Sequence, residues 1–286
     1  GDYLWLIDTL KQAGAKQIFI ARMSPIFHGH RRFKAGTRDW YWQIQEAIED
    51  VAGLSGAVLI DFNTPLKSRP DLMPDQLHPV ASGAAMLARE VFSAITGDYG
   101  GLSLPWGWTD SMVLQQGLPV TLEGKADRGT SVTVSFGKRK YHAKASATGT
   151  WSVTMDTPEP GGPYILTVST DRNETIELNN ILSGEVWFCS GQSNMEWTVA
   201  RSDGATETLR DCGDSDLRLL HFTHRDLRWN EPWDSLTLAT MNDLDFYTKA
   251  SWCSADSGSV SSFSAVAYYF GRRLHEELKV PVGVIE

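Results

Sequence analysis

The sequence predicts an α/β fold combined with an all-β region. Residues 1–97 alternate between runs with a helical apolar period and short apolar runs that are typical of buried strands. Residues 111–182 show only two-residue periodicity between turn residues, and from Glu185 the alternating pattern returns. We therefore expect two α/β segments that flank an antiparallel β-sandwich.

The first segment contains five expected elements. Helices are predicted at residues 3–13, 40–51 and 81–95, and strands at 16–22 and 56–62. This order is typical of part of a doubly wound α/β domain. The turn-forming run Gly97-Asp98-Tyr99-Gly100-Gly101 marks the point where the pattern changes.

The middle segment shows no helical period. Short strands are predicted at residues 112–114, 120–124, 131–136, 141–145, 150–155, 164–168 and 175–178. Gly, Asp, Asn and Pro separate them, as in a β-sandwich of about seven strands.

The last segment begins with a predicted strand at residues 185–190. A helix at 196–209, a strand at 216–222, a helix at 263–278 and a strand at 280–285 follow. Residues 225–258 form a long irregular segment rich in Trp and Asp, of a length that usually has a functional role.

Composition excludes several classes of function. The net charge of −9 argues against a nucleic-acid partner, whose binding proteins carry basic faces. No apolar run approaches the roughly 20 residues needed to span a bilayer. The three cysteines lack zinc-ligand spacing: Cys189 is expected to be a buried thiol, and a Cys212–Cys253 disulfide stays open. His28-Gly29-His30 is better explained as a solvated basic loop than as a metal site, so neither a metal nor a cofactor is expected.

Ser193 is the candidate nucleophile. It follows the apolar run Gly184–Ser190 in a small-residue turn, as expected at the carboxyl edge of a parallel sheet. Gly191 allows a tight turn, and Gln192 and Asn194 flank a serine whose hydroxyl and backbone N–H could both face a substrate. A serine that only caps a following helix is the competing interpretation.

Asp75 and His78 form the candidate base. Their spacing of three residues within one turn can place the carboxylate beside one imidazole nitrogen, which leaves the other nitrogen free to accept a proton. A turn aspartate followed by a solvated histidine is the alternative.

Several separated blocks resemble the sialate O-acetylesterase family of SGNH hydrolases. The serine block is Gly191-Gln192-Ser193-Asn194-Met195, and the other blocks are 110–115, 149–153, 161–164, 263–270 and 280–286. The resemblance covers about residues 102–286. It implies a flavodoxin-like SGNH segment at 183–286, preceded by a β-sandwich domain at 102–182.

Residues 1–97 resemble the carboxyl-terminal half of a separate SGNH/GDSL-type esterase domain, which closes on a D-x-x-H block. By this likeness Asp75 orients His78, and His78 is the base. We expect a piece of a longer protein with two tandem esterase domains, so that Ser193 and His78 belong to different active sites. A circularly permuted single domain, in which His78 serves Ser193, is the competing account.

The resemblance implies a serine-dependent carbohydrate O-acetylesterase that acts on acetylated sugars, first of all sialic acid esters, in the periplasm or outside the cell. An acetylxylan-type esterase and a non-catalytic carbohydrate-binding module are the alternatives. The binding module would present an exposed aromatic platform on the sandwich. Sugar contacts of the esterase are expected in residues 225–258.

Overall fold

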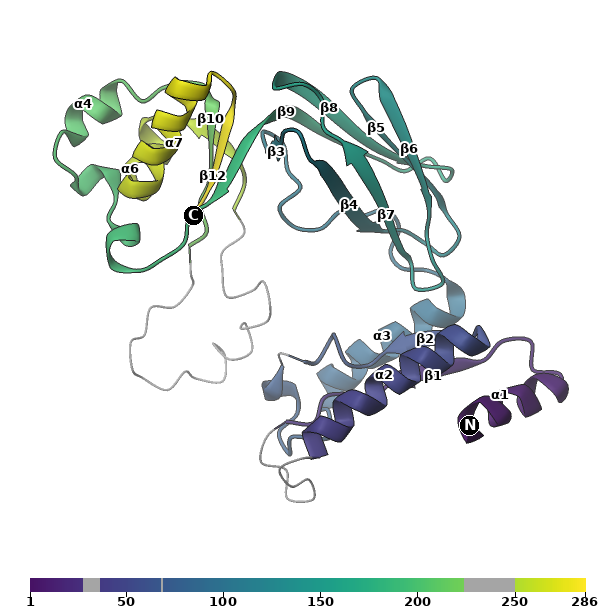
Figure 1. Cartoon of the computed structure of the whole chain (residues 1–286). Helices are drawn as coiled ribbons and strands as arrows, with labels where there is room; N and C mark the ends of the chain where they lie inside the picture. Colours follow the sequence, from purple (N-terminus) through teal and green to yellow (C-terminus); the bar gives the residue numbers. More distant parts are fainter. Residues whose placement is uncertain (28–36, 68, 224–249) are drawn as a thin grey trace.

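The structure is a computed structural model that describes residues 1–27, 37–67, 69–223 and 250–286 (Figure 1). It has a mixed α/β fold with one large mixed sheet. We name its parts the first α/β unit (residues 1–97), the β region (102–182) and the second α/β unit (183–286). The two α/β units are attached to different parts of the β region (Figure 1).

The first α/β unit contains all five expected helices and strands. They are α1 (Asp2–Gln12), β1 (Phe19–Arg22), α2 (Thr37–Ser55), β2 (Val58–Asp61) and α3 (Ala81–Thr96), with the short 3-10 helix η1 (Pro70–Leu72) before α3. Strands β1 and β2 pair in parallel as a two-stranded sheet. Ile7, Ile20 and Ala52 are buried together where α1 and α2 pack beside this sheet.

The β region has two layers of strands. They are β3 (Val113–Gln115), β4 (Pro119–Lys125), β5 (Ser131–Phe136), β6 (Arg139–Lys144), β7 (Thr150–Asp156), β8 (Gly161–Thr170) and β9 (Thr175–Phe188). Strands β4 and β7 form a separate antiparallel pair, and the others belong to an eight-stranded sheet. Alternate residues of β7 (Trp151, Val153, Met155) are buried in one core with residues of β5 and β8, so the pair covers a face of the larger sheet.

Strand β9 differs from the prediction, which placed two strands at 175–178 and 185–190. One strand of 14 residues runs through both, because the residues between them also have partners. Leu182–Gly184 pairs in parallel with β3, and Glu185–Phe188 pairs in parallel with β12 (Val282–Ile285). Register shifts against β8 accompany the left-handed backbone of Asn180 (φ 60°). The β region and the second α/β unit are therefore joined through one continuous strand.

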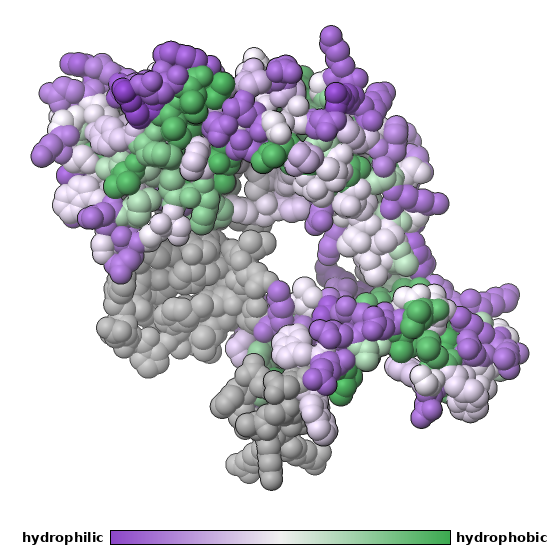
Figure 2. Space-filling model, in the orientation of Figure 1, coloured by the Kyte–Doolittle hydropathy of each residue, from purple (hydrophilic) through white to green (hydrophobic). Residues whose placement is uncertain are grey.

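The second α/β unit continues the same sheet in the order β11-β10-β12-β9. Its further elements are α4 (Ala205–Arg210), β10 (Asp214–Leu220), β11 (Cys253–Ala255), α6 (Ser257–Ser261) and α7 (Ala265–Leu278). Strands β10, β12 and β9 are parallel. Helix α7 packs closely on β12 at Gly271. A Cβ at this position would overlap the side chain of Val284, so the close approach requires glycine. Figure 2 shows hydrophobic residues gathered over this unit, where Phe188, Val266 and Phe270 are exposed.

The prediction of one helix at residues 196–209 is wrong. The chain instead forms two 3-10 turns, η2 (Ser193–Glu196) and η3 (Val199–Arg201), before the short α4. Thr198 forms an isolated antiparallel bridge with Ser264, and Ala265 donates its backbone N–H to the carbonyl of Trp197 at 2.8 Å. These contacts hold residues 197–198 extended, and Gly204 (φ 75°) starts α4 afresh.

The three cysteines are free thiols, so the Cys212–Cys253 disulfide is not formed. Cys212 is buried, Cys253 is exposed, and Cys189 is half-buried rather than fully buried. No helix in the described ranges is long and apolar enough to cross a membrane.

Candidate active site

The end of β9 is held in place by β12. Glu185 donates its N–H to the carbonyl of Pro281 at 2.9 Å, and Cys189 donates to that of Ile285 at 2.7 Å. A Cβ at Gly184 would overlap the Pro281 carbonyl, so only glycine fits this close approach. The turn that carries Ser193 therefore leaves the sheet from a fixed point at its carboxyl edge.

Ser193 has a left-handed backbone, with φ of 58°. This conformation is uncommon for a residue with a side chain, costs on the order of 1–3 kcal/mol and clusters at active sites and ligand clamps. The side chain is exposed, and its hydroxyl donates a hydrogen bond to Gln192 Oε1. Among the described residues, no acceptor faces the Ser193 backbone N–H. Both groups that an acyl-transfer nucleophile must present are thus available.

The residues around Ser193 shape the turn. A Cβ at Gly191 would lie 2.6 Å from Met195 Cγ, so Gly191 lets the Met195 side chain fold back over the turn. Met195 packs against the core of the second α/β unit, whereas Gln192 and Asn194 are exposed beside the serine. No histidine or carboxylate of the described ranges is hydrogen-bonded to the Ser193 hydroxyl.

Two further polar groups lie at this edge of the sheet. His221 follows β10 and Glu286 follows β12, and these two strands and β9 are adjacent. His221 Nε2 lies 3.8 Å from Glu286 Oε2, and Glu286 accepts the backbone N–H of Ser264 at 2.8 Å. Burial raises the pKa of Glu286 and lowers the pKa of His221. The sequence contained a signal for Glu286, which directly follows a predicted apolar strand, whereas His221 lies within the strand predicted at 216–222 and follows β10 only in the structure.

Asp75 and His78 form a preassembled pair in the loop before α3. Asp75 Oδ2 lies 2.6 Å from His78 Nδ1, while Oδ1 accepts the backbone N–H groups of Leu77 (3.0 Å) and His78 (2.7 Å). Both side chains are exposed. The carboxylate favours the tautomer that is protonated at Nδ1, which leaves Nε2 able to accept a proton.

The pKa of Asp75 lies well below its usual range. The largest cause is the hydrogen bond with the His78 side chain, and the backbone N–H groups of His78 and Leu77 add to it. The ionised Asp75 therefore stabilises the folded state at every pH above the pKa of a free carboxyl. This stabilisation is lost as the pH falls through the depressed pKa of Asp75.

We expect His78→Ala to raise the pKa of Asp75 toward its usual value, because the largest stabilising contact is removed. The change can be followed by carboxyl carbon NMR in an acid titration. Asp71 is the matched control, since the Arg69 guanidinium lowers its pKa and is untouched by the substitution. An unchanged titration of Asp75 in the variant would contradict the observed pairing.

The structure does not bring Ser193 and His78 together. His78 belongs to the unit whose strands β1 and β2 form their own sheet, and no described strand of that unit pairs with β9, β10 or β12. The single sheet that the circularly permuted account requires is therefore absent from the described ranges, and the separate sheets favour the tandem account.

The expected sugar-contact segment lies mostly outside the described residues, as do Trp229, Trp233, His28 and His30. Trp252 is described, but it is buried in the core shared with the β region. Residues 102–182 are all described, and the large hydrophobic side chains exposed among them are Leu118 and Ile165, neither of them aromatic. The aromatic side chains of this region, such as Trp106 and Trp108, are half-buried or buried, so none of them is an exposed platform of the kind that a binding module would present.

A groove of about 910 Å³ is present on the β region, lined by Glu123, Lys125, Lys144 and Trp151 among others. It contains neither Ser193 nor His78. Within the described ranges, no group of three or more His, Cys, Asp or Glu side chains could hold a metal ion.

Comparison with known proteins gives a consistent set of relatives, although no protein-family model matches the chain. The mouse sialate O-acetylesterase is 30% identical over 168 residues, which are 55% of this chain and 30% of the relative. The human sialate O-acetylesterase is 28% identical over 62% of this chain and 35% of the relative. A carbohydrate acetylesterase from Xanthomonas citri has a TM-score of 0.53 and 27% identity, and the match covers 64% of this chain and 39% of that one. The chain thus spans about a third of the length of these relatives.

Proposed function

We propose that the whole protein is a serine-dependent carbohydrate O-acetylesterase, because the matched part of the chain is similar to sialate O-acetylesterases and to a solved carbohydrate acetylesterase. The observation that carries the proposal is Ser193 itself. It is an exposed serine in a left-handed turn at the carboxyl edge of parallel strands, with a backbone N–H that no described group occupies.

The reaction begins when Ser193 Oγ attacks the carbonyl carbon of an acetyl ester. The hydroxyl proton passes to a general base, and the Ser193 N–H donates to the oxyanion that forms on the acetyl oxygen. The C–O bond to the sugar then breaks, the sugar oxygen takes up a proton, and an acetyl-enzyme remains. Water cleaves the acetyl-enzyme and releases acetate. Gln192 Oε1 accepts a hydrogen bond from the Ser193 hydroxyl in the resting state, and the exposed Asn194 is the next residue of the same turn.

Asp75 and His78 belong, in this proposal, to a second and separate esterase unit. Asp75 orients the imidazole through Nδ1, and Nε2 acts as the base for a serine of that unit. The arrangement is then two SGNH-type segments, at residues 1–97 and 183–286, that flank a β-sandwich at 102–182. The separate sheets of the two α/β units support it.

Acetylated sialic acids are the proposed substrates, since the curated relatives are named for that activity. The solved relative is named only as a carbohydrate acetylesterase, so acetylated xylan is the second candidate. Substrates of this kind place the protein in the periplasm or outside the cell.

The substrate class can be tested by acetate release from O-acetylated sialic acid and from acetylated xylo-oligosaccharides with the whole protein. We expect a higher kcat/KM for the sialic acid ester. A higher kcat/KM for the xylan ester would instead identify acetylated xylan as the preferred substrate. Acetate release from neither sugar would contradict the proposed function.

A further inference from the structure

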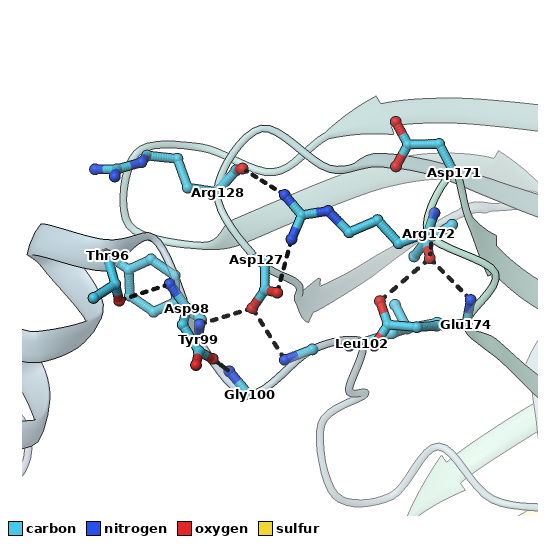
Figure 3. A network of polar contacts seen from close by, with 12 residues as sticks. Thr96, Asp98, Tyr99, Gly100, Leu102, Asp127, Arg128, Asp171, Arg172 and Glu174 are labelled. Carbon is cyan, nitrogen blue, oxygen red and sulfur yellow. Dashed lines mark hydrogen bonds and ion pairs between the residues drawn. The ribbon is translucent and has the colours of Figure 1, made fainter.

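The connection between the first α/β unit and the β region has the composition of a flexible linker but not its structure. Residues 97–101 contain three glycines, yet several of their backbone groups form hydrogen bonds with neighbouring residues (Figure 3). Thr96 Oγ1 accepts the N–H of Asp98 at 3.1 Å, which continues the last turn of α3 into the connection.

Arg128 of the β region binds the carboxyl end of α3. Its guanidinium donates to the carbonyls of Ala94 (2.9 Å) and Ile95 (3.1 Å), and its backbone N–H donates to Gly97 O at 2.9 Å. These carbonyls belong to the end of a helix, where they lack partners within the helix and carry partial negative charge. The positive guanidinium is therefore complementary to the helix end in both hydrogen bonding and charge.

Asp127 binds the connection itself. Its Oδ1 accepts the backbone N–H groups of Tyr99 (2.8 Å) and Gly101 (3.2 Å), and its Oδ2 accepts from Arg172 at 2.8 Å (Figure 3). The N–H of Tyr99 is the largest cause of the lowered pKa of Asp127, and the Arg172 cation acts in the same direction. Arg172 also donates to the carbonyl of Arg128 at 3.4 Å, so one network includes both anchoring residues.

Two more contacts close the connection. Glu174 Oε1 accepts the N–H of Leu102 at 2.9 Å and lies where a Cβ at Gly101 would be. The Tyr99 ring lies against Gly149, and its hydroxyl donates to the carbonyl of Ala147 at 2.9 Å. An aromatic anchor and a series of charge-assisted hydrogen bonds thus replace the freedom expected of a glycine-rich segment.

We propose that residues 96–102 form a locked joint, which fixes the first α/β unit on the β region as one rigid body. Strand β9 then carries this fixed geometry into the second α/β unit, because it is continuous through both parts. The Asp75–His78 pair is consequently held in a fixed position relative to the β region. This inference is based on the contacts of residues 96–102 and does not depend on the proposed esterase activity.

The test is Asp127→Ala in the whole protein, read by amide hydrogen exchange and by small-angle X-ray scattering. We expect the Tyr99 and Gly101 amides to exchange about tenfold faster or more, because a charged acceptor is lost, and the distribution of interatomic distances to broaden. Asp156→Ala is the matched control. It removes the exposed Arg139–Asp156 ion pair of the same region and should change neither readout.

Arg172→Gln provides a second variant that leaves the bonds from Asp127 to the backbone in place. It should produce a smaller increase of exchange at the same amides. Exchange of the wild-type Tyr99 and Gly101 amides at the rate of an unstructured peptide would overturn the locked joint. So would an Asp127→Ala protein whose scattering matches the wild type.

Discussion

Ser193→Ala is expected to lower kcat for the acetylated sugar by about 10³-fold or more, with little change in KM. The hydroxyl forms a covalent bond during the reaction, so its loss removes the acyl-enzyme route, whereas substrate binding uses other groups. Steady-state acetate release gives both parameters. Ser190→Ala is the matched control, since this exposed serine lies three residues earlier in the same turn and should keep near wild-type activity.

The comparison must also include His78→Ala and the double variant, because the proposed second unit could hydrolyse the same ester. If Ser193→Ala keeps full activity while both His78→Ala and the double variant lose it, the activity belongs to the first α/β unit. The assignment of Ser193 would then fail. If His78→Ala alone has the wild-type rate with the sialic acid ester, the two sites are independent, as the separate sheets indicate.

Phe263→Ala is expected to lower the free energy of unfolding by about 3–5 kcal/mol, the range measured for large aromatic residues in cores. Phe263 is fully buried in the core of the second α/β unit. Its ring lies edge-on to His221 with centroids 5.6 Å apart, and its carbonyl accepts the N–H of Val199. Chemical denaturation gives the change in free energy.

Phe188→Ala is the control for this substitution. The residue type is the same and the position is in the same unit, but 71% of Phe188 is exposed, so the loss should stay below about 1 kcal/mol. Equal effects of the two substitutions would contradict the burial of Phe263 and the packing of the loop before α7.

Local patterns predicted most of the elements, because each depends on neighbouring residues. The alternation of Trp151, Val153 and Met155 identifies β7, and the apolar stripe of α7 is equally local. The helix at 196–209 was wrong because long-range contacts decide that stretch: the Thr198–Ser264 bridge holds it extended against its local preference. The continuity of β9 also depends on partners, β3 and β12, that lie far away in the sequence.

The candidate site was predictable to a similar degree. The contact between Asp75 and His78 could be predicted because it depends only on their spacing of three residues within one turn. In the structure Asp75 Oδ2 lies 2.6 Å from His78 Nδ1. The left-handed backbone of Ser193 could not be predicted, since a residue with a side chain does not prefer it. Likewise, the contact between His221 and Glu286 depends on the strand order, which puts β10 next to β12. The roles of all these residues remain predictions.

The most direct test of the central claim, that Ser193 is the nucleophile, is covalent labelling of the whole protein with a fluorophosphonate. This reagent forms a phosphonyl ester with activated serine hydroxyls, and mass spectrometry of the digested protein locates the adduct. We expect the peptide that contains Ser193 to carry the adduct, and we expect acetylated substrate to protect this serine from labelling. An active enzyme in which the label never appears on Ser193 would contradict the account.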